Sequence, residues 1–318
     1  MWGEKDFLSS LRRQAERLAY LTTASLEVRP NLACGFAVLI FSLTSIQSSH
    51  ADAPFVLYGN DDRREVFEEK SSIKRTLARS VAAVFAPGVL KKNRDGSYSA
   101  DAVSYRSEYN LCETERFAEQ SIASDCSAFL IAPDVVATAS HCIIDEWNCS
   151  RLRFAFDYGY MKLGQDPNLL PAENVYRCDR ILSMSDADNS KRDFAIVKLD
   201  REVTSREPLK LRTQGMVNAG EELFVIGHPS GLPMKIASRA RVREVLADKI
   251  LANLDTYAGN SGSPIFNAKT YEVEGLLVSG EQDFVKVGSC NISRRCDDHA
   301  CRGEEVMPIG KLLPLLPN

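Results

Sequence analysis

The chain has 318 residues, of which 44% are hydrophobic and 26% charged, which is the composition of an ordinary folded protein and excludes a disordered or fibrous one. Its 39 basic and 43 acidic side chains leave a formal net charge of −4, which argues against a nucleic-acid-binding protein because such proteins carry a basic excess or stripe. The longest apolar run, at residues 32–43, is shorter than the roughly 20 residues that span a bilayer, so a polytopic membrane protein is excluded as well.

Residues 1–53 are predicted to form an n-region and a secretory signal peptide. The apolar run at 32–43 is followed by a polar stretch and then by Ala51-Asp-Ala53, a small-x-small cleavage site. Cleavage is expected after Ala53 or after Ala51, which gives a secreted or periplasmic protein without stable membrane insertion. The alternative is an amphipathic helix at 7–20 followed by an uncleaved anchor. Residues 54–80 are then an N-terminal arm or a pro-segment.

The cysteines point to the same compartment. Nine are present, and one of them, Cys34, lies within the predicted signal. The remaining even number in an exported chain indicates disulfides. A zinc cluster is the alternative, but only Cys296 and Cys301 are close enough in sequence to support it. We therefore expect no metal and no other cofactor.

From residue 80 on, short apolar segments rich in Val, Ile and Phe alternate with turn residues. Such segments are typical of strands, and they lie at 80–85, 126–131, 135–138, 152–156, 194–199, 222–226, 240–245, 263–266 and 273–278. Many short strands with few helical periods predict an all-β sandwich or barrel. A polar stretch at 201–214 is expected to link two halves, 81–208 and 209–318.

Three motifs, in the order His, Asp, Ser, are candidates for chemistry. Val-Ala-Thr-Ala-Ser-His141 ends a predicted strand, Asp193 precedes the apolar strand Phe-Ala-Ile-Val, and Gly259-Asn-Ser261-Gly-Ser-Pro forms a turn. A serine needs a nearby base to act as a nucleophile, and histidine is suited to that role. An acid on the other ring nitrogen holds the required tautomer. We expect a triad of His141, Asp193 and Ser261, with the N–H groups of Gly259 and Ser261 forming an oxyanion hole.

Other side chains compete for the same roles. His228, between a glycine and a proline, is the rival base, and its loop position makes it the weaker candidate. His299 lies in a charged loop and is expected to be solvated. Asp186 and Asp188 are the rival acids, but both lie in a polar loop and not at the start of an apolar strand.

Together these motifs resemble the chymotrypsin-fold serine endopeptidases. The Gly-Asn-Ser-Gly-Ser-Pro turn is most similar to the bacterial branch that includes the glutamyl endopeptidases, and residues 56–63 resemble the mature start of those enzymes. The resemblance covers about residues 56–310. It implies two antiparallel six-stranded β-barrels, in 81–208 and 209–318, with the active site in the cleft between them. It also implies a disulfide between Cys126 and Cys142.

For the other cysteines the sequence leaves the pairing mostly open. A bond between Cys149 and Cys178 is favoured because both lie in the first barrel; the partners of the remaining four are undetermined, namely Cys112, Cys290, Cys296 and Cys301. The resemblance further implies hydrolysis of protein or peptide substrates through an acyl-enzyme, and we expect a monomer.

Two positions depart from the family pattern. Animal digestive enzymes carry an acid before the nucleophile, which binds the new N-terminal ammonium on activation, whereas Asn260 occupies that place here. The oxyanion hole is therefore either preformed or dependent on a different N-terminal contact. Glutamyl endopeptidases place a histidine in the strand that walls the specificity pocket. Residues 275–280 contain none, which argues against glutamate specificity.

The resemblance instead favours cleavage after Arg or Lys. Asp255 lies six positions before Ser261, where trypsin-like enzymes have the acid at the floor of the pocket. Gly280 and Gly303 match the glycines that let a long side chain enter. The alternative is that Asp255 caps a turn. Glu304 is a further acid near the pocket, as is its neighbour Glu305.

Three alternative functions remain. A catalytically silent protease-fold binding protein is disfavoured because no triad member is substituted. An endopeptidase with non-basic specificity would leave the triad unchanged. An esterase of the α/β-hydrolase type would need the order Ser, Asp, His and alternating helices, neither of which is found here.

Overall fold

The computed structural model describes residues 57–185 and 193–316. The predicted signal peptide with Cys34, its cleavage sites, and Val56 lie outside the described residues, as do Asp186 and Asp188. The chain divides into the units Met1–His50 and Ala51–Asn318, and everything below concerns the described part of the second unit.

The first barrel is built from six strands: β2 (Val81–Phe85), β7 (Cys126–Ala132), β8 (Val135–Thr138), β9 (Arg153–Phe156), β11 (Val175–Met184) and β12 (Ala195–Leu199). They close in the order β11-β12-β8-β7-β2-β9, and each pair is antiparallel. Because side chains alternate along a strand, Ala128 and Leu130 of β7 fill the barrel interior, whereas Phe129 between them faces the second barrel.

The second barrel closes in the same way. Its strands are β13 (Glu222–Gly227), β14 (Lys235–Val245), β15 (Ile250–Ala252), β16 (Pro264–Asn267), β17 (Val273–Ser279) and β21 (Glu304–Pro308). The order is β13-β14-β15-β21-β17-β16, again with antiparallel pairs. Val225, Ile265 and Val306 belong to the apolar cluster inside it.

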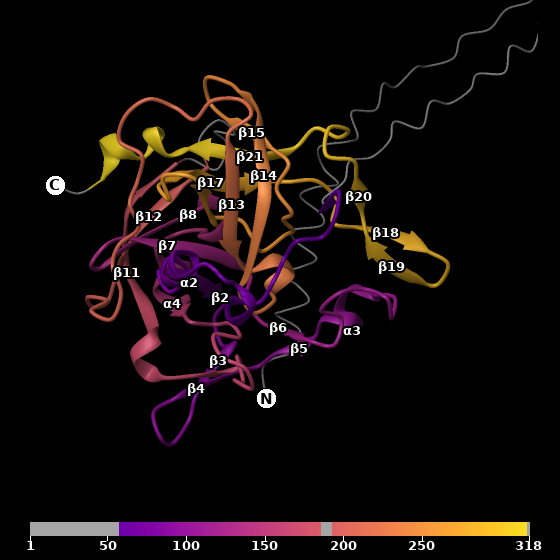
Figure 1. The fold of residues 1–318 in the computed structure, drawn as a ribbon. Helices are drawn as coiled ribbons and strands as arrows, with labels where there is room; N and C mark the ends of the chain where they lie inside the picture. The colour runs from indigo at the N-terminus through magenta and orange to yellow at the C-terminus, as the bar shows by residue number, and fades with distance from the viewer. Residues whose placement is uncertain (1–56, 186–192, 317–318) are drawn as a thin grey trace, which may run out of the picture. The chain divides into compact units, whose positions relative to one another are not determined.

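The two barrels share one apolar core. Phe129 and Ile196 of the first barrel and Phe224, Ile236 and Leu276 of the second belong to the same buried cluster. Residues 200–221, which contain no strand, join β12 to β13 (Figure 1), and the predicted division at 208/209 falls within this segment. The predicted all-β fold with two six-stranded antiparallel barrels is confirmed.

Short elements surround the barrels (Figure 1). Within the described residues, no helix has the length and apolar character needed to cross a membrane. The helices are α2 (Ser72–Ala78), α3 (Tyr105–Tyr109) and α4 (Glu146–Arg151), with one-turn 3-10 helices η1 (Val66–Glu68), η2 (Ser140–Cys142), η3 (Ala172–Asn174), η4 (Pro229–Gly231), η5 (Ile309–Lys311) and η6 (Leu313–Leu315). The outer strands are β1 (Leu57–Tyr58), β3 (Leu90–Lys92), β4 (Tyr98–Ala100), β5 (Val103–Ser104), β6 (Ser121–Ile122), β10 (Leu169–Leu170), β18 (Phe284–Val287), β19 (Cys290–Ser293) and β20 (Arg295–Cys296).

Among the described residues, four disulfides link these parts. Cys126 is bonded to Cys142 and Cys149 to Cys178, which are the two pairs that the sequence analysis favoured. The pairs left open are Cys112–Cys290 and Cys296–Cys301. The Cys112–Cys290 bond joins the segment that precedes the first barrel's β7 to the β18–β19 hairpin of the second half.

Residues 57–63 form an arm that is packed into the body of the protein. β1 pairs in parallel with β20, and Leu57 is fully buried. Arg63 is 1% exposed, forms an ion pair with Asp61 and stacks on the ring of Tyr257 with its guanidinium carbon 4.3 Å from the ring centroid. The arm therefore contributes to the core around Tyr257.

Candidate active site

The pairing of β8 with β12 brings His141 to Asp193. Thr138, the last residue of β8, lies opposite Ala195, the first residue of β12. His141 lies in the turn η2 just after β8, and Asp193 lies just before β12, so antiparallel register places them side by side. His141 Nδ1 is 2.6 Å from Asp193 Oδ2, and the Ser140 hydroxyl donates to Asp193 Oδ1 at 2.7 Å.

Asp193 is held in its charged form. Burial alone would raise its pKa, but the hydrogen bond and charge of His141, with donors from Ser140 and the His141 backbone, outweigh burial and hold the pKa below its ordinary value. An ionised carboxylate on Nδ1 favours the His141 tautomer whose Nε2 is free to accept a proton. The His141 side chain is 48% exposed, so substrate can reach this nitrogen.

The turn that carries Ser261 packs directly on the end of β8. The backbone N–H of Ser127 donates to the Ser261 carbonyl at 2.9 Å. A Cβ on Gly262 would lie 2.4 Å from Thr138 Oγ1, so only glycine fits this approach. The turn of Ser261 therefore lies against the end of the strand that leads to His141. Among the described residues, the Ser261 hydroxyl forms no hydrogen bond.

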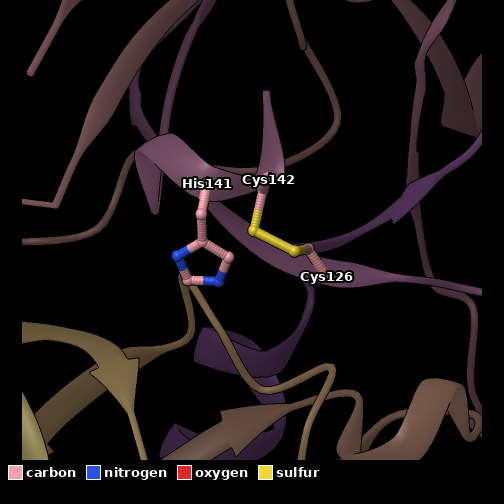
Figure 2. A group of neighbouring side chains, drawn as sticks. All are labelled: Cys126, His141 and Cys142. Carbon is pink, nitrogen blue, oxygen red and sulfur yellow. A yellow bond between two sulfur atoms is a disulfide. The ribbon is translucent and has the colours of Figure 1, made fainter. Parts of the chain in front are cut away.

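A disulfide anchors the turn that carries His141 (Figure 2). Cys142, next to His141, is bonded to Cys126 at the start of β7. The ligand atoms of Cys126, His141 and Cys142 lie within 4.8 Å of one another, as they would in a metal centre. Because the two sulfurs are bonded to each other, they are not available as thiolate ligands, and the cluster is explained without a metal.

Gly259 occupies a position that only glycine can fill. Its φ is +88°, and a Cβ there would lie 2.6 Å from the His228 carbonyl oxygen. Asn260, which stands where related digestive enzymes have an acid, is 2% exposed, and its backbone N–H donates to the Tyr257 carbonyl at 3.0 Å. No ammonium is needed to neutralise an amide side chain.

The rival histidine is buried behind this turn. His228 is 0% exposed, its Nδ1 lies 3.3 Å from the Ser127 hydroxyl, and its ring stacks on Tyr158. Burial lowers the pKa of His228 to about 3, so its imidazole is neutral at ordinary pH. A side chain without access to substrate is no candidate base. His299 is exposed, in agreement with expectation.

His228 predicts a loss of stability in acid. Its pKa of about 3 in the folded protein lies below the ordinary 6.5, so the unfolded chain binds the extra proton between these values. The free energy of unfolding should therefore be unaffected by this group above pH 6.5 and fall by about 1.4 kcal/mol per pH unit below it. In chemical denaturation at pH 4 to 7, His228→Gln should lose stability less steeply with acid than the wild type does. The exposed-site control His299→Gln should follow the wild type; equal slopes for all three proteins would contradict the assignment.

A pocket of about 300 Å³ opens beside Ser261. Gly280 lies in its wall, directly over Glu304: a Cβ on Gly280 would be 1.9 Å from Glu304 Oε2. Glu304 is 1% exposed; its Oε2 accepts the Thr256 hydroxyl at 2.9 Å, and among the described residues its Oε1 has no partner. Burial raises the pKa of Glu304 well above its ordinary value.

A second acid of the pocket is Asp283. Its Oδ2 accepts the backbone N–H of Ala258 at 3.0 Å, and the loss of water around the half-buried side chain raises its pKa to about 7. The remaining acid in the wall, Glu281, is paired with Arg302 at 2.8 Å. Neither Glu304 nor Asp283 forms an ion pair with any described residue. Asp283 was missed in the sequence because no spacing rule marks it.

Asp255 does not lie where the sequence analysis placed it. It is absent from the pocket lining; instead its carboxylate accepts the N–H of Tyr58 at 2.7 Å and that of Asp62 at 3.3 Å. Burial raises the pKa of Asp255 to about 8. The six-residue spacing from Ser261 identifies the correct segment but not the direction of the Asp255 side chain. That direction is set by the hydrogen bonds to the N-terminal arm.

Gly303 also lies outside the pocket lining. Its φ is +100°, and a Cβ there would be 3.1 Å from the Ala252 carbonyl oxygen, so the glycine serves the turn into β21. Of the three predicted pocket residues only Gly280 is in the lining, which also contains the buried acid Glu304.

Comparison with known proteins agrees with this picture. Residues 126–276, which hold the His141, Asp193 and Ser261 motifs, match the family described as the trypsin-like peptidase domain. This match and the two closed barrels, which have the arrangement of the chymotrypsin fold, confirm the resemblance seen in the sequence.

Two solved structures are similar over most of their length. One is a Glu endopeptidase in complex with MPD, with 16% identity, a TM-score of 0.48, and coverage of 80% of this chain and 96% of that chain. The other is an inactive mutant form of Rv3671c from M. tuberculosis H37Rv, with 14% identity, a TM-score of 0.45, and coverage of 77% and 89%. No curated protein matches the sequence.

Proposed function

We propose that the protein is a serine endopeptidase that hydrolyses peptide bonds through an acyl-enzyme. The observation that carries the proposal is the 2.6 Å contact between His141 Nδ1 and Asp193 Oδ2 beside the turn of Ser261. Ser261 attacks the scissile carbonyl, and His141 takes its proton and later gives it to the leaving amine. Asp193 orients His141 and stabilises the imidazolium, while the N–H groups of Gly259 and Ser261 hold the oxyanion. The mechanism uses no metal ion or cofactor.

The substrates we propose are proteins or peptides with Arg or Lys before the scissile bond. Glu304 and Asp283, the two unpaired acids of the pocket, support this preference. A buried carboxylate is costly when it is charged without a partner, and their raised pKa values reflect that cost. A guanidinium or ammonium that enters the pocket supplies the missing partner, so that basic side chains bind more tightly than neutral ones.

We further propose an exported, monomeric enzyme in the extracellular space or periplasm that keeps its N-terminal arm. Four disulfides support export, because such bonds persist in oxidising compartments. The burial of Leu57 and Arg63 supports retention of the arm, since removal would expose the wall of the pocket at Tyr257.

A fluorophosphonate probe, which reacts with an activated serine, tests the assignment and separates it from a catalytically silent binding protein. The wild type should be labelled and Ser261→Ala should not. Ser263→Ala is the matched control: its side chain is fully buried two positions further on, so labelling should persist. An unlabelled wild type, or labelling that survives in Ser261→Ala, would contradict the proposed function.

A further inference from the structure

The peptide between Ala258 and Gly259 has a defined orientation. The Ala258 carbonyl accepts the Ser230 N–H at 2.5 Å. In a trans peptide the C=O and N–H bonds point in opposite directions. The N–H of Gly259 is therefore directed away from Ser230, and within the described chain no acceptor occupies it.

The N–H of Ser261, two residues further along the chain, is oriented in the same way. The Asn260 carbonyl accepts the Ser263 N–H at 2.8 Å, so the N–H of Ser261 is directed away from Ser263. It too has no acceptor among the described residues. The two N–H groups assigned to the oxyanion hole therefore have no acceptor among the described residues. Each is oriented by the hydrogen-bonded carbonyl of its own peptide, which belongs to Ala258 in one case and to Asn260 in the other.

A third contact comes from the first barrel. The Ser127 hydroxyl donates to the Gly259 carbonyl at 2.9 Å and accepts the backbone N–H of His228 at 3.1 Å. Ser127 lies in β7 and is fully buried, so this one hydroxyl ties the turn of the second barrel to the wall of the first. Its own N–H bonds the Ser261 carbonyl, which places Ser127 on both sides of the turn.

The turn at 228–231 is shaped to support Gly259. Ser230 has a φ of +53°, a conformation that costs energy for a residue with a side chain and that persists only where the surroundings impose it. The Tyr105 and Tyr158 hydroxyls donate to Ser230 Oγ and to the Gly231 carbonyl, both at 3.3 Å. The strained turn therefore presents the Ser230 N–H to Ala258.

We infer that Ser127, with the backbone of the 228–231 turn, preforms the oxyanion hole. Ser127 is then a positioning residue, acting through the Gly259 carbonyl. These contacts take over the task that an N-terminal ammonium performs in enzymes with an acid before the nucleophile, which Asn260 cannot serve. Rotation of the 258–259 peptide would turn the Ala258 carbonyl toward the oxyanion and leave the buried Ser230 N–H without an acceptor. The inference rests on the proposed function and specifies how that site is built.

The test compares Ser127→Ala with Ser80→Ala. Ser80 is also a buried serine whose hydroxyl donates to a backbone carbonyl, that of Glu207 at 2.6 Å, but it lies outside the site. Loss of a direct oxyanion donor lowers kcat by about 100- to 1,000-fold, so loss of a group that orients one should lower kcat on an arginyl peptide amide by about tenfold. KM should stay within about twofold of the wild-type value, because the pocket is untouched.

A peptide aldehyde provides the second readout. Its hemiacetal with Ser261 places an oxygen in the hole, so Ser127→Ala should bind it about tenfold more weakly, matching the loss in kcat. Ser80→Ala should keep the wild-type kcat and aldehyde affinity even though its Tm falls. Ser127→Thr, which retains the hydroxyl, should restore most of the activity.

The outcomes separate the two proposals. An active wild type whose kcat and aldehyde affinity are unchanged in Ser127→Ala overturns the inference and leaves the proposed function standing. Equal losses in Ser127→Ala and Ser80→Ala also overturn it, because the effect would then be one of general stability. A wild type that neither hydrolyses peptides nor reacts with the fluorophosphonate overturns the proposed function itself.

Discussion

Replacement of Ser261 by alanine is expected to lower kcat on a peptide amide by on the order of a million-fold, and replacement of His141 by alanine by a similar factor. Each change removes one member of the proposed nucleophile–base pair, and neither member is expected to work alone. The double variant should therefore be little worse than either single one. The measurement is kcat for the three variants with one peptide amide substrate.

Asp193→Asn serves as the graded control. The asparagine side chain still lies next to His141 Nδ1, which is 2.6 Å from the aspartate oxygen in the wild type. Its amide favours the His141 tautomer in which Nε2 carries the proton and cannot act as a base, so kcat should fall by about 10,000-fold. Additive losses in the Ser261 and His141 double variant, or an Asp193→Asn enzyme with full activity, would contradict the triad. The Ser261→Ala and His141→Ala variants should keep the wild-type unfolding temperature, since His141 and Ser261 are not part of the core.

Glu304→Gln is expected to lower kcat/KM for substrates with Arg or Lys before the scissile bond by about 100-fold, because the buried cation would face a neutral amide. Substrates with a neutral residue at that place should be affected little. The measurement is a panel of peptide amides that differ only in this residue. Retention of the basic preference in Glu304→Gln would contradict the role of the pocket acids.

Asp255→Asn is the matched control for that experiment. Asp255 accepts the N–H groups of Tyr58 and Asp62, and an amide can accept only one of them, so Tm should fall. The order of preference among substrates should nevertheless stay the same. If Asp255→Asn lost the preference for basic residues and Glu304→Gln kept it, Asp255 and not Glu304 would be the acid that determines specificity.

The pH dependence of KM provides a second view of the same acids. Burial raises the pKa of Asp283 to about 7 and also raises the pKa of Glu304 well above its ordinary value. Without substrate, both carboxyl groups are therefore largely protonated in mild acid. A cationic side chain binds the ionised form. KM for basic substrates should therefore decrease as pH rises through about 7, and Glu304→Gln should weaken this trend.

Most of the fold can be predicted from the sequence because its strands are locally marked. β7, β8 and β12 are short apolar segments bounded by turn residues, and the structure has strands over almost the same ranges. β11 was not predicted because its exposed face carries charged residues, including Arg177 and Asp179. β21 was not predicted because it begins with Glu304 and Glu305, and a buried carboxylate interrupts the apolar pattern of a strand.

The candidate site likewise has residues that the sequence predicts and residues that it does not. His141, Asp193 and Ser261 each lie in a recognisable motif at a strand end or a tight turn. The environment of Asp255 was not predictable, because its partner Tyr58 lies 197 positions away and only the folded arm brings them together. Ser127 carries no local signal either; its contact with Gly259 spans 132 positions and joins two barrels. Long-range contacts decide where such side chains point.

The bond between Cys112 and Cys290 spans 178 positions, with residues 200–221 inside its ring. A single proteolytic nick in that connecting segment would therefore produce a two-chain form whose parts stay covalently attached. The hairpin that follows Asp283 would remain tethered to the other chain by the same bond. The two halves would separate only after reduction of this disulfide. The protein should therefore tolerate a break in its backbone within residues 200–221, which connect the two barrels.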